Sequence, residues 1–394
     1  MIKNKEKQSQ KTKGKKALKA ILIILAGIAA AAAIIMITNS ITCAVNTSFA
    51  SKAQRVTVEN QIVPTEQDGS YVFTTDKEFK ILQLTDIHIG GGFMSFAKDR
   101  MAMNSIKKLV SDSKPDLVIF TGDMTFPVFK AGTLNNLRPA KELLTLMDSL
   151  GVYWTAVPGN HDVEAYNLYS YDKWADLYES EDYKYCLFGR GEPSVDGYGN
   201  QIIDIKNSRG KITQSLVLFD SNSYPADNKF KNELNGIYDN IHENQLDWYK
   251  AEIGKRIKNG KTVSSLCFFH IPLEEYKTAW EEYKKNNYKD TDTVKILFGK
   301  NGEKNEEICC PEKSDNVFET FRELKSTKAV FCGHDHLNNF CADYKGIKLV
   351  YGLSIDYLAY ANIANKNEQR GGTVITTNPD SSFAVSQLHY EQKK

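Results

Sequence analysis

The sequence is poor in cysteine and has almost no net charge. Its 394 residues include seven cysteines, an odd number, and no Cys-x-x-Cys pair. Neither a small disulfide-rich fold nor a zinc ribbon is therefore expected. Cys332 and Cys341 flank a histidine-rich turn, where they either pair across neighbouring strands or stay as buried thiols. The 50 basic and 49 acidic residues leave a net charge of +1.

This charge balance conceals a basic N-terminus. Residues 1–19 hold eight lysines and one glutamate, so residues 20–394 carry 42 basic and 48 acidic side chains, a net charge of −6. Because residues 20–394 are mildly acidic, we expect no basic surface for nucleic acid and no nucleic-acid partner.

One long hydrophobic run follows the lysines. Residues 20–38 are nineteen residues without a charge, and as a helix they would span roughly 28 Å, close to the hydrocarbon thickness of a bilayer. A signal peptide usually has a shorter apolar core, although Ser48-Phe49-Ala50 offers a small-residue cleavage pattern. We expect a single-pass anchor in the cell membrane, with the N-terminus cytoplasmic and the main domain extracellular, or a secreted protein if the segment is cleaved.

The rest of the chain is expected to form one folded domain. We place a basic cytoplasmic segment at 1–19, the anchor or signal at 20–38, an exported linker at 39–75 and the domain at 76–394. Apolar strands alternate with helices from residue 79 onward, which is typical of a parallel sheet with right-handed crossovers.

Two regions interrupt the alternation. A tyrosine-rich region, 164–200, is expected to form helix and loop over the site, with its aromatic residues more typical of packing than of substrate contact. A segment rich in Lys, Asn and Glu, 276–312, is expected to be a solvent-facing insertion.

Polar side chains that suit metal ions follow the strongest predicted strands. Five of the seven histidines lie at such strand ends. Because the carboxyl ends of parallel strands meet at one edge of a sheet, we expect these groups to converge. In a strand, residues two apart point to the same face, so Asp86 and His88 could bind one ion together. In chain order the candidate residues are Asp86, His88, Asp123, Asn160, His161, Asp162, His270, His334 and His336.

The mixture of imidazole and carboxylate groups indicates a pair of transition-metal ions. Taken singly, each motif is more typical of a turn or a core histidine, and only their joint occurrence indicates a metal site. Imidazole suits zinc, iron or manganese, and the carboxylate of Asp123 can bridge two ions. Two such ions bind a bridging hydroxide and hold the oxygens of an in-line displacement. Phosphate ester hydrolysis is the reaction that such a site favours.

These motifs resemble, complete and in order, the five motifs of the calcineurin-like metallophosphoesterase superfamily, over about residues 79–352. The resemblance implies an α/β fold of the αββα type, in which two mixed β-sheets are flanked by helices. It also implies that His161 is the acid near the leaving-group oxygen, held by a carboxylate such as Asp162 or Asp86. The implied ligands are Asp86, His88, Asp123 and His336 on one ion, and Asp123, Asn160, His270 and His334 on the other.

Within the superfamily, the sequence around His270 resembles purple-acid-phosphatase-like phosphoesterases. Two positions depart from true purple acid phosphatases, which have glycine in place of His88 and a tyrosine ligand in place of Phe126. The resemblance therefore implies a centre without the tyrosinate ligand and without a strict need for ferric iron. We expect two metal ions, with Mn, Zn and Fe all open.

Substrate specificity stays open at this level. The glycines after His88 are expected to leave room for a phosphate, with Gly91, Asn160 and His161 binding the substrate. A phosphodiesterase acting on nucleotides, phospholipid headgroups or wall polymers is the alternative enzyme, and no motif favours a protein phosphatase. A catalytically silent binding module is the alternative from another class. We expect a monomer, with structural roles for His242 and His389, which lie outside the motifs.

Overall fold

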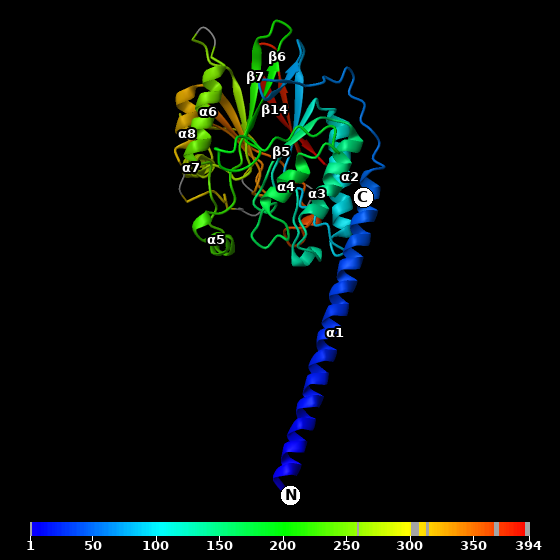
Figure 1. The fold of residues 1–394 in the computed structure, drawn as a ribbon. Coiled ribbons are helices and arrows are strands. Elements are labelled where there is room, and N and C mark those ends of the chain that lie inside the picture. The colour runs from blue at the N-terminus through cyan, green and yellow to red at the C-terminus, as the bar shows by residue number, and fades with distance from the viewer. Residues whose placement is uncertain (1, 258–259, 301–306, 313–314, 366–369, 391–394) are drawn as a thin grey trace.

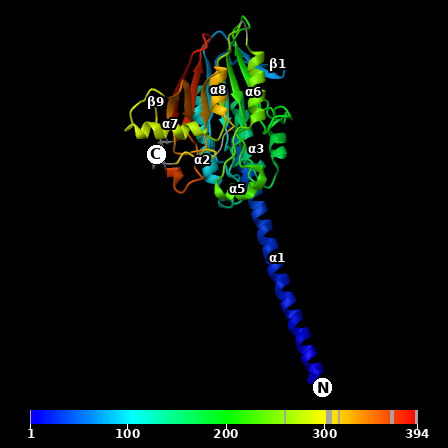
Figure 2. The same ribbon diagram turned by 90° about the vertical axis from the view of Figure 1, so that its left-hand side faces the viewer.

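Two mixed β-sheets lie face to face at the centre of the folded domain, and helices cover both outer faces (Figures 1 and 2). This computed structural model describes residues 2–257, 260–300, 307–312, 315–365 and 370–390. The predicted αββα arrangement of two mixed sheets is confirmed. No disulfide forms within the described part of the chain, and Cys332 and Cys341 are buried free thiols.

The smaller sheet carries the first motifs. Its strands β3, β4 and β5 are parallel, β13 pairs antiparallel with β3, and β14 pairs antiparallel with β13. The strand order is β14 (Phe383–His389), β13 (Gly371–Thr377), β3 (Phe79–Leu84), β4 (Leu117–Thr121) and β5 (Trp154–Val157). The helices on its outer side are α2 (Phe96–Ser113), α3 (Leu137–Leu150) and α4 (Tyr171–Tyr178).

The larger sheet carries the later motifs at the ends of β8 and β10. Its order is β1 (Thr65–Gln67), β2 (Ser70–Thr74), β6 (Gln201–Lys206), β7 (Ile212–Leu218), β8 (Ser265–Phe268), β10 (Thr327–Cys332), β12 (Ile347–Tyr351), β11 (Cys341–Tyr344) and β9 (Val294–Phe298). The helices that cover it are α6 (Glu243–Lys255), α7 (Glu274–Lys285) and α8 (Val317–Leu324). Shorter helical elements are η1 (Phe129–Ala131), η2 (Ala226–Asn228), α5 (Lys229–Asn235) and η3 (Ile363–Asn365).

The central strands are buried on both faces, which explains their continuous apolar runs. In β8, Leu266 and Phe268 point into the core between the sheets, whereas Cys267 points into the core beneath the outer helices. Successive side chains of a strand alternate between its faces, so a strand with a core on each side needs apolar residues at every position. Phe268 stacks on Phe331 of β10 at 4.8 Å between ring centroids.

The N-terminal helix α1 (Ile2–Ala50) is continuous from the apolar run into the domain (Figure 1). Its stretch Lys13–Ala50 is long and apolar enough to cross a membrane. The structure differs from the predicted linker 39–75 at both ends. Residues 39–50 continue the helix and pack against α3, while β2 pairs in parallel with β6 inside the larger sheet.

The segment 276–312, expected to be a solvent-facing insertion, is exposed or half-buried at most of its described positions, but it forms α7 and β9 and so belongs to the folded domain. Tyr276 of α7 is fully buried, and its hydroxyl donates to the carbonyl oxygens of Val330 and Val350. Strand β9 pairs antiparallel with β11 and forms the edge of the larger sheet. Residues 301–306 lie outside the described part of the chain.

Candidate metal centre

The site is built on loops that follow the carboxyl ends of the strands. Asp86 and His88 lie beyond the end of β3, with φ angles of 51° and 54°, so strand alternation does not bring them together as predicted. Their backbone N–H groups instead donate to the carbonyl oxygens of Gly122 and Asp123 in the loop after β4, at 3.1 and 3.0 Å. Asp123 (φ 50°) and His334 (φ 75°) are also left-handed. Such conformations are uncommon outside glycine and concentrate at functional sites.

The glycine that precedes each motif makes room for a ligand from another motif. A Cβ at Gly122 would lie 2.5 Å from the ring of His270, and one at Gly159 would lie 2.2 Å from the Oδ1 of Asp123. A Cβ at Gly333 would lie 2.8 Å from the Oδ2 of Asp86. The Gly-Asp, Gly-Asn-His-Asp and Gly-His-x-His patterns therefore follow from close packing between the loops.

A first group of ligand atoms comes from Asp86, His88, Asp123 and His336, all buried and within 4.8 Å of one another. The Nε2 of His88 lies 3.3 Å from the Oδ2 of Asp123. The Nε2 of His336 lies 3.5 Å from the Oδ1 of Asp86.

A second group shares Asp123 with the first and adds His270 and His334. The Nε2 of His270 lies 3.2 Å from both the Oδ2 of Asp123 and the Oδ1 of Asn160. The Nδ1 of His334 lies 3.3 Å from the same nitrogen. Asp123 thus stands between the two groups, where one carboxylate can serve both.

Buried atoms without partners show that these residues fit metal ions. The Nε2 of His88 and the Oδ2 of Asp123, which lie 3.3 Å apart, are buried and make no hydrogen bond. A buried polar atom without a partner costs free energy. Where two such atoms face each other with their lone pairs, a cation between them removes that cost. Histidine and carboxylate together suit manganese, zinc or iron.

Asp356 supports two of the histidines from behind. Its Oδ2 lies 3.1 Å from the Nδ1 of His336, and its Oδ1 lies 3.7 Å from the Nδ1 of His88. Burial opposes the charged form of Asp356, yet His88 and His336 hold its pKa below the usual range. A partner on Nδ1 directs the Nε2 lone pair toward the metal. The sequence interpretation missed Asp356, although it follows β12 as the other site residues follow their strands.

His270 receives equivalent support from the backbone, because its Nδ1 lies 2.8 Å from the carbonyl oxygen of Thr121. Donation from Nδ1 leaves Nε2 free to bind a metal. Asn160 is held by its amide, which donates to the hydroxyl of Tyr224 at 3.1 Å.

His161 is the most exposed of the predicted site histidines, with 24% of its side chain accessible to solvent. Its Nδ1 lies 2.6 Å from the Oε1 of Glu164, and its Nε2 lies 3.9 Å from the Oδ2 of Asp123. Burial lowers the pKa of His161, but Asp123 and Glu164 outweigh it and raise that pKa above the ordinary value. Glu164 was not predicted, although an acid three residues after the histidine was a usable signal.

The expected support of His161 by Asp162 or Asp86 is wrong. Asp162 accepts hydrogen bonds from the backbone N–H groups of Thr125 and Gly159, at 2.8 and 2.9 Å, and so ties the loop after β4 to the loop after β5. Asp86 accepts from the backbone N–H of His334 at 3.1 Å. Both carboxylates accept hydrogen bonds from the backbone of other loops, so they hold the loops together and do not support His161.

Gly91 does not leave room for a phosphate as predicted. It is buried, its N–H donates to Asp99, and a Cβ at this position would lie 2.4 Å from the Cδ of Pro139. With φ at 68°, Gly91 makes a tight turn that lets α3 approach the loop.

Aromatic rings enclose the mouth of the site. Phe126 lies 4.4 Å from the ring of His161 and 5.2 Å from that of His88, so no phenol group stands at this position. Tyr360 stacks on His336 at 4.3 Å. In the tyrosine-rich region, by contrast, Trp174 is fully buried in the core.

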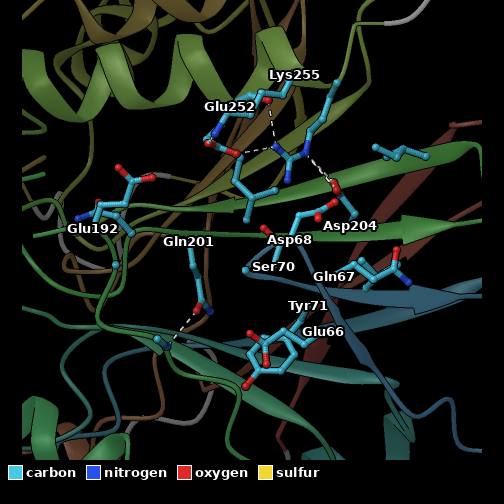
Figure 3. Close-up of a pocket in the computed structure, with 18 of the residues that line it drawn as sticks. Glu66, Gln67, Asp68, Ser70, Tyr71, Glu192, Gln201, Asp204, Glu252 and Lys255 are labelled. Carbon is cyan, nitrogen blue, oxygen red and sulfur yellow. Dashed lines mark hydrogen bonds and ion pairs between the residues drawn. The ribbon is translucent and has the colours of Figure 1, made fainter. Parts of the chain in front are cut away.

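A cavity of about 720 Å³ lies elsewhere, between β1, β2, β6 and α6 (Figure 3). Arg256 is held there by Asp204 and Glu252. None of the predicted site residues lines it, so this cavity is separate from the metal centre. His242 is also remote, since its ring contacts Asp196 and Asp239 beside α6.

The chain is similar to a family and to several known proteins. The family model described as calcineurin-like phosphoesterase matches residues 79–338. A curated protein called probable inactive purple acid phosphatase 28, from Arabidopsis thaliana, is 27% identical over 313 residues, which cover 73% of each chain. Phosphatase DCR2 of Saccharomyces cerevisiae is 26% identical over 68% of this chain and 46% of its own. A solved purple acid phosphatase, PPD1 from yellow lupin, aligns with a TM-score of 0.38 at 8% identity, covering 81% of this chain and 54% of its own.

Proposed function

We propose, because this chain belongs to the calcineurin-like phosphoesterase family, that it hydrolyses phosphate esters at a centre of two metal ions. The observation that carries the proposal is the pair of buried ligand groups that share Asp123. A relative called probable inactive makes activity a question to test. The proposal is supported by the two buried groups, which hold six of the seven ligands predicted from the motifs, and by Asn160, whose Oδ1 lies 3.2 Å from the Nε2 of His270.

The seven ligands would hold the two ions with Asp123 between them. Asp86, His88 and His336 belong to one ion, and Asn160, His270 and His334 to the other. Bound ions of this kind activate water as a nucleophile and neutralise charge on the phosphoryl oxygens. The protein contributes a fixed, buried arrangement of ligands, because the glycines and the supporting carboxylate of Asp356 hold them in place.

His161 would donate the proton that the leaving-group oxygen needs. Its Nδ1 is engaged by Glu164, and its Nε2 is the nitrogen that faces the site. General acid assistance of this kind is worth about 10² to 10⁴ in rate. Asp162 has no part in this step, because its oxygens are occupied by backbone N–H groups.

The test is the substitution Asp123→Ala in the purified chain. We expect the metal content to fall from about two equivalents and kcat/KM to fall by about 10³ or more, since metal ions supply several kcal/mol of transition-state stabilisation. Elemental analysis and assays with a phosphate monoester and a diester measure both effects. His242→Gln, which removes a remote histidine, should change neither.

Full turnover by Asp123→Ala would exclude the dinuclear mechanism. A wild-type chain that holds two metals but hydrolyses neither monoesters nor diesters would favour the silent binding module. Hydrolysis of the diester alone would select the phosphodiesterase.

We also propose that α1 anchors the enzyme in the membrane. The continuous apolar helix α1 supports a single-pass membrane protein with its catalytic domain outside the cell, because the N-terminal lysines favour the cytoplasmic side. An uncleaved α1 is supported by its packing against α3.

A further inference from the structure

Exposed hydrophobic side chains gather at one edge of the domain. Outside α1, twelve large hydrophobic residues of the described part are exposed, and eight of them lie on loops or short helices at the edge that carries the metal centre. Phe129 is 84% exposed and Leu234 is 70% exposed. We define the apolar rim as Phe93, Met94, Phe129, Leu168, Phe230 and Leu234.

The apolar rim surrounds the metal centre because its residues lie on the loops that build it. Phe93 and Met94 follow the glycines after His88 directly. Leu168 lies on the loop that carries His161. The N–H of Ala165 in this loop donates to Glu233, which ties α5 to the site.

The anchor helix leaves the domain at the same edge. The side chain of Asn39 donates to the carbonyl oxygen of Gly132 at 2.8 Å and accepts from the N–H of Phe93 at 2.9 Å. Asn39 directly follows Thr38, the last residue of the uncharged run. At about 1.5 Å per residue, the end of that run lies within one helical turn of the rim.

The C-terminal end of α1, at Ala50, lies toward the opposite edge of the domain. Beyond it, the N–H of Val56 donates to the carbonyl oxygen of Leu150, at the end of α3 remote from the site. Figures 1 and 2 both show α1 leaving the domain at the end where α5 lies, and Figure 2 shows β1 at the opposite end.

The outer face of α1 stays apolar as it passes the rim. Ile37 and Ile41 are each 60% exposed, and Val45 is 42% exposed. The spacing of four residues puts all three on one side of the helix. A lipid contact that reaches Ile41 would bring the surface of the bilayer to the level of the rim.

We propose that the apolar rim rests in the surface of the bilayer that α1 spans, and that the metal centre takes phosphate esters of membrane lipid headgroups as substrates. This inference rests on the proposed phosphoesterase function. Amphipathic surfaces of this kind lie at the boundary between headgroups and acyl chains. The phosphate of a lipid lies at that same depth, next to the exposed face of His161.

The first test compares lipid and soluble substrates with the full chain in phosphatidylcholine vesicles. The lipid substrates are phosphatidic acid, a monoester, and phosphatidylglycerol, a diester; the soluble ones are para-nitrophenyl phosphate and bis-para-nitrophenyl phosphate. The double variant Phe129→Glu/Leu234→Glu should hydrolyse whichever lipid the wild type accepts at least about tenfold more slowly than the wild type does, because charged side chains oppose insertion into the membrane interface. Its hydrolysis of the soluble ester should equal that of the wild type. Val63→Glu, at an exposed position remote from the rim, should change neither.

Each other result overturns the inference. Unchanged lipid hydrolysis by the double variant, or an equal loss on both substrates, excludes the rim as a lipid contact. A wild type that hydrolyses soluble esters but neither lipid excludes the substrate class and leaves the phosphoesterase function intact. A wild type that hydrolyses nothing removes both proposals.

The second test does not depend on catalysis. Phe129→Trp in vesicles of brominated phosphatidylcholine should lose fluorescence from the added indole, whereas Val63→Trp should not. Absence of quenching at Phe129→Trp would overturn the bilayer contact and indicate a protein partner at the rim.

Discussion

In the proposed mechanism, His161 and Glu164 would decide how the site handles a leaving group that needs a proton. The carboxylate of Glu164 fixes the imidazole through Nδ1 and leaves Nε2 toward the reacting ester. An alkoxide needs a proton as it departs, whereas para-nitrophenolate is stable without one. The contribution of this pair therefore depends on the substrate.

We predict that Glu164→Gln lowers kcat for an alkyl phosphate by about 10 to 100-fold, the usual cost of losing a supporting hydrogen bond. The loss for para-nitrophenyl phosphate should be much smaller. Steady-state kinetics with both substrates measure the difference. Glu179→Gln, in a surface ion-pair network with Arg190, serves as the control. Equal losses on the two esters would contradict the role of His161 as an acid.

Gly91 is expected to matter for stability and not for substrate binding. We predict that Gly91→Ala lowers the free energy of unfolding by about 1–3 kcal/mol, because the left-handed backbone is strained with a side chain and the added Cβ meets Pro139. Gly210→Ala, with φ at 74° and open space around it, isolates the cost of the backbone alone. Urea unfolding and KM for a soluble ester are the measurements. A raised KM with unchanged stability would restore the phosphate-binding role.

At the scale of residues, the sequence predicted which side chains suit a metal centre better than it predicted which residues hold the loops in place. The ligand types at strand ends predicted a metal centre, and the structure brings those side chains together. Asp162 was misassigned because it accepts hydrogen bonds from backbone N–H groups, and Gly91 because it makes a tight turn against Pro139. Residue type alone shows neither role. Glu164 was not predicted because the predicted site residues are those directly after strand ends, whereas Glu164 lies three residues beyond His161.

The N-cap of helix α6, His242, makes a pH-dependent contribution to stability. Hydrogen bonds to Asp239 and Asp196 raise the pKa of His242 to about 9, against the effect of burial. A histidine in the unfolded chain titrates near about 6.5. Because the folded pKa is the higher one, this stabilisation is complete below about pH 6.5 and is lost as the pH rises through about 9.

We predict that His242→Gln is less stable than the wild type near about pH 6 and that the difference disappears near about pH 10. Thermal unfolding at the two pH values measures it. A difference of equal size at both pH values would show that the charge of His242 has no part in stability.

At the scale of elements, the strongly apolar strands were predictable and the half-exposed ones were not. Strands such as β4 are buried at every position, so their apolar runs stand out. In α7 only Tyr276 and Ala279 are buried, and β9 alternates at the edge of its sheet. Their charged outer faces dominated the composition and suggested an insertion.

At the scale of the whole molecule, the last turns of α1 belong to the folded domain. Asn46 accepts a hydrogen bond from Arg100 of α2, and Asn39 joins the loops beside the metal centre. The sequence placed the boundary at Thr38 because charge and apolar character end there. The polar residues that follow face the domain, which only the packing against α3 reveals.

We predict that a chain beginning at Ser51 unfolds several degrees below one beginning at Asn39, because α3 loses the apolar cover that α1 provides. Differential scanning calorimetry compares the two. The variant Asn39→Ala/Asn46→Ala in the full chain should show part of the loss. Equal melting temperatures would mean that α1 is only a tether.

If the chain is the membrane-anchored phosphoesterase proposed above, the unbroken course of α1 would also determine how it meets its substrate. A flexible tether would let the domain tumble and sample a volume, whereas a rigid helix docked by Asn39 holds its catalytic edge at a constant height and tilt. The encounter of the enzyme with a lipid substrate would then be lateral diffusion in two dimensions. Turnover would follow the mole fraction of substrate within the membrane and not its bulk concentration.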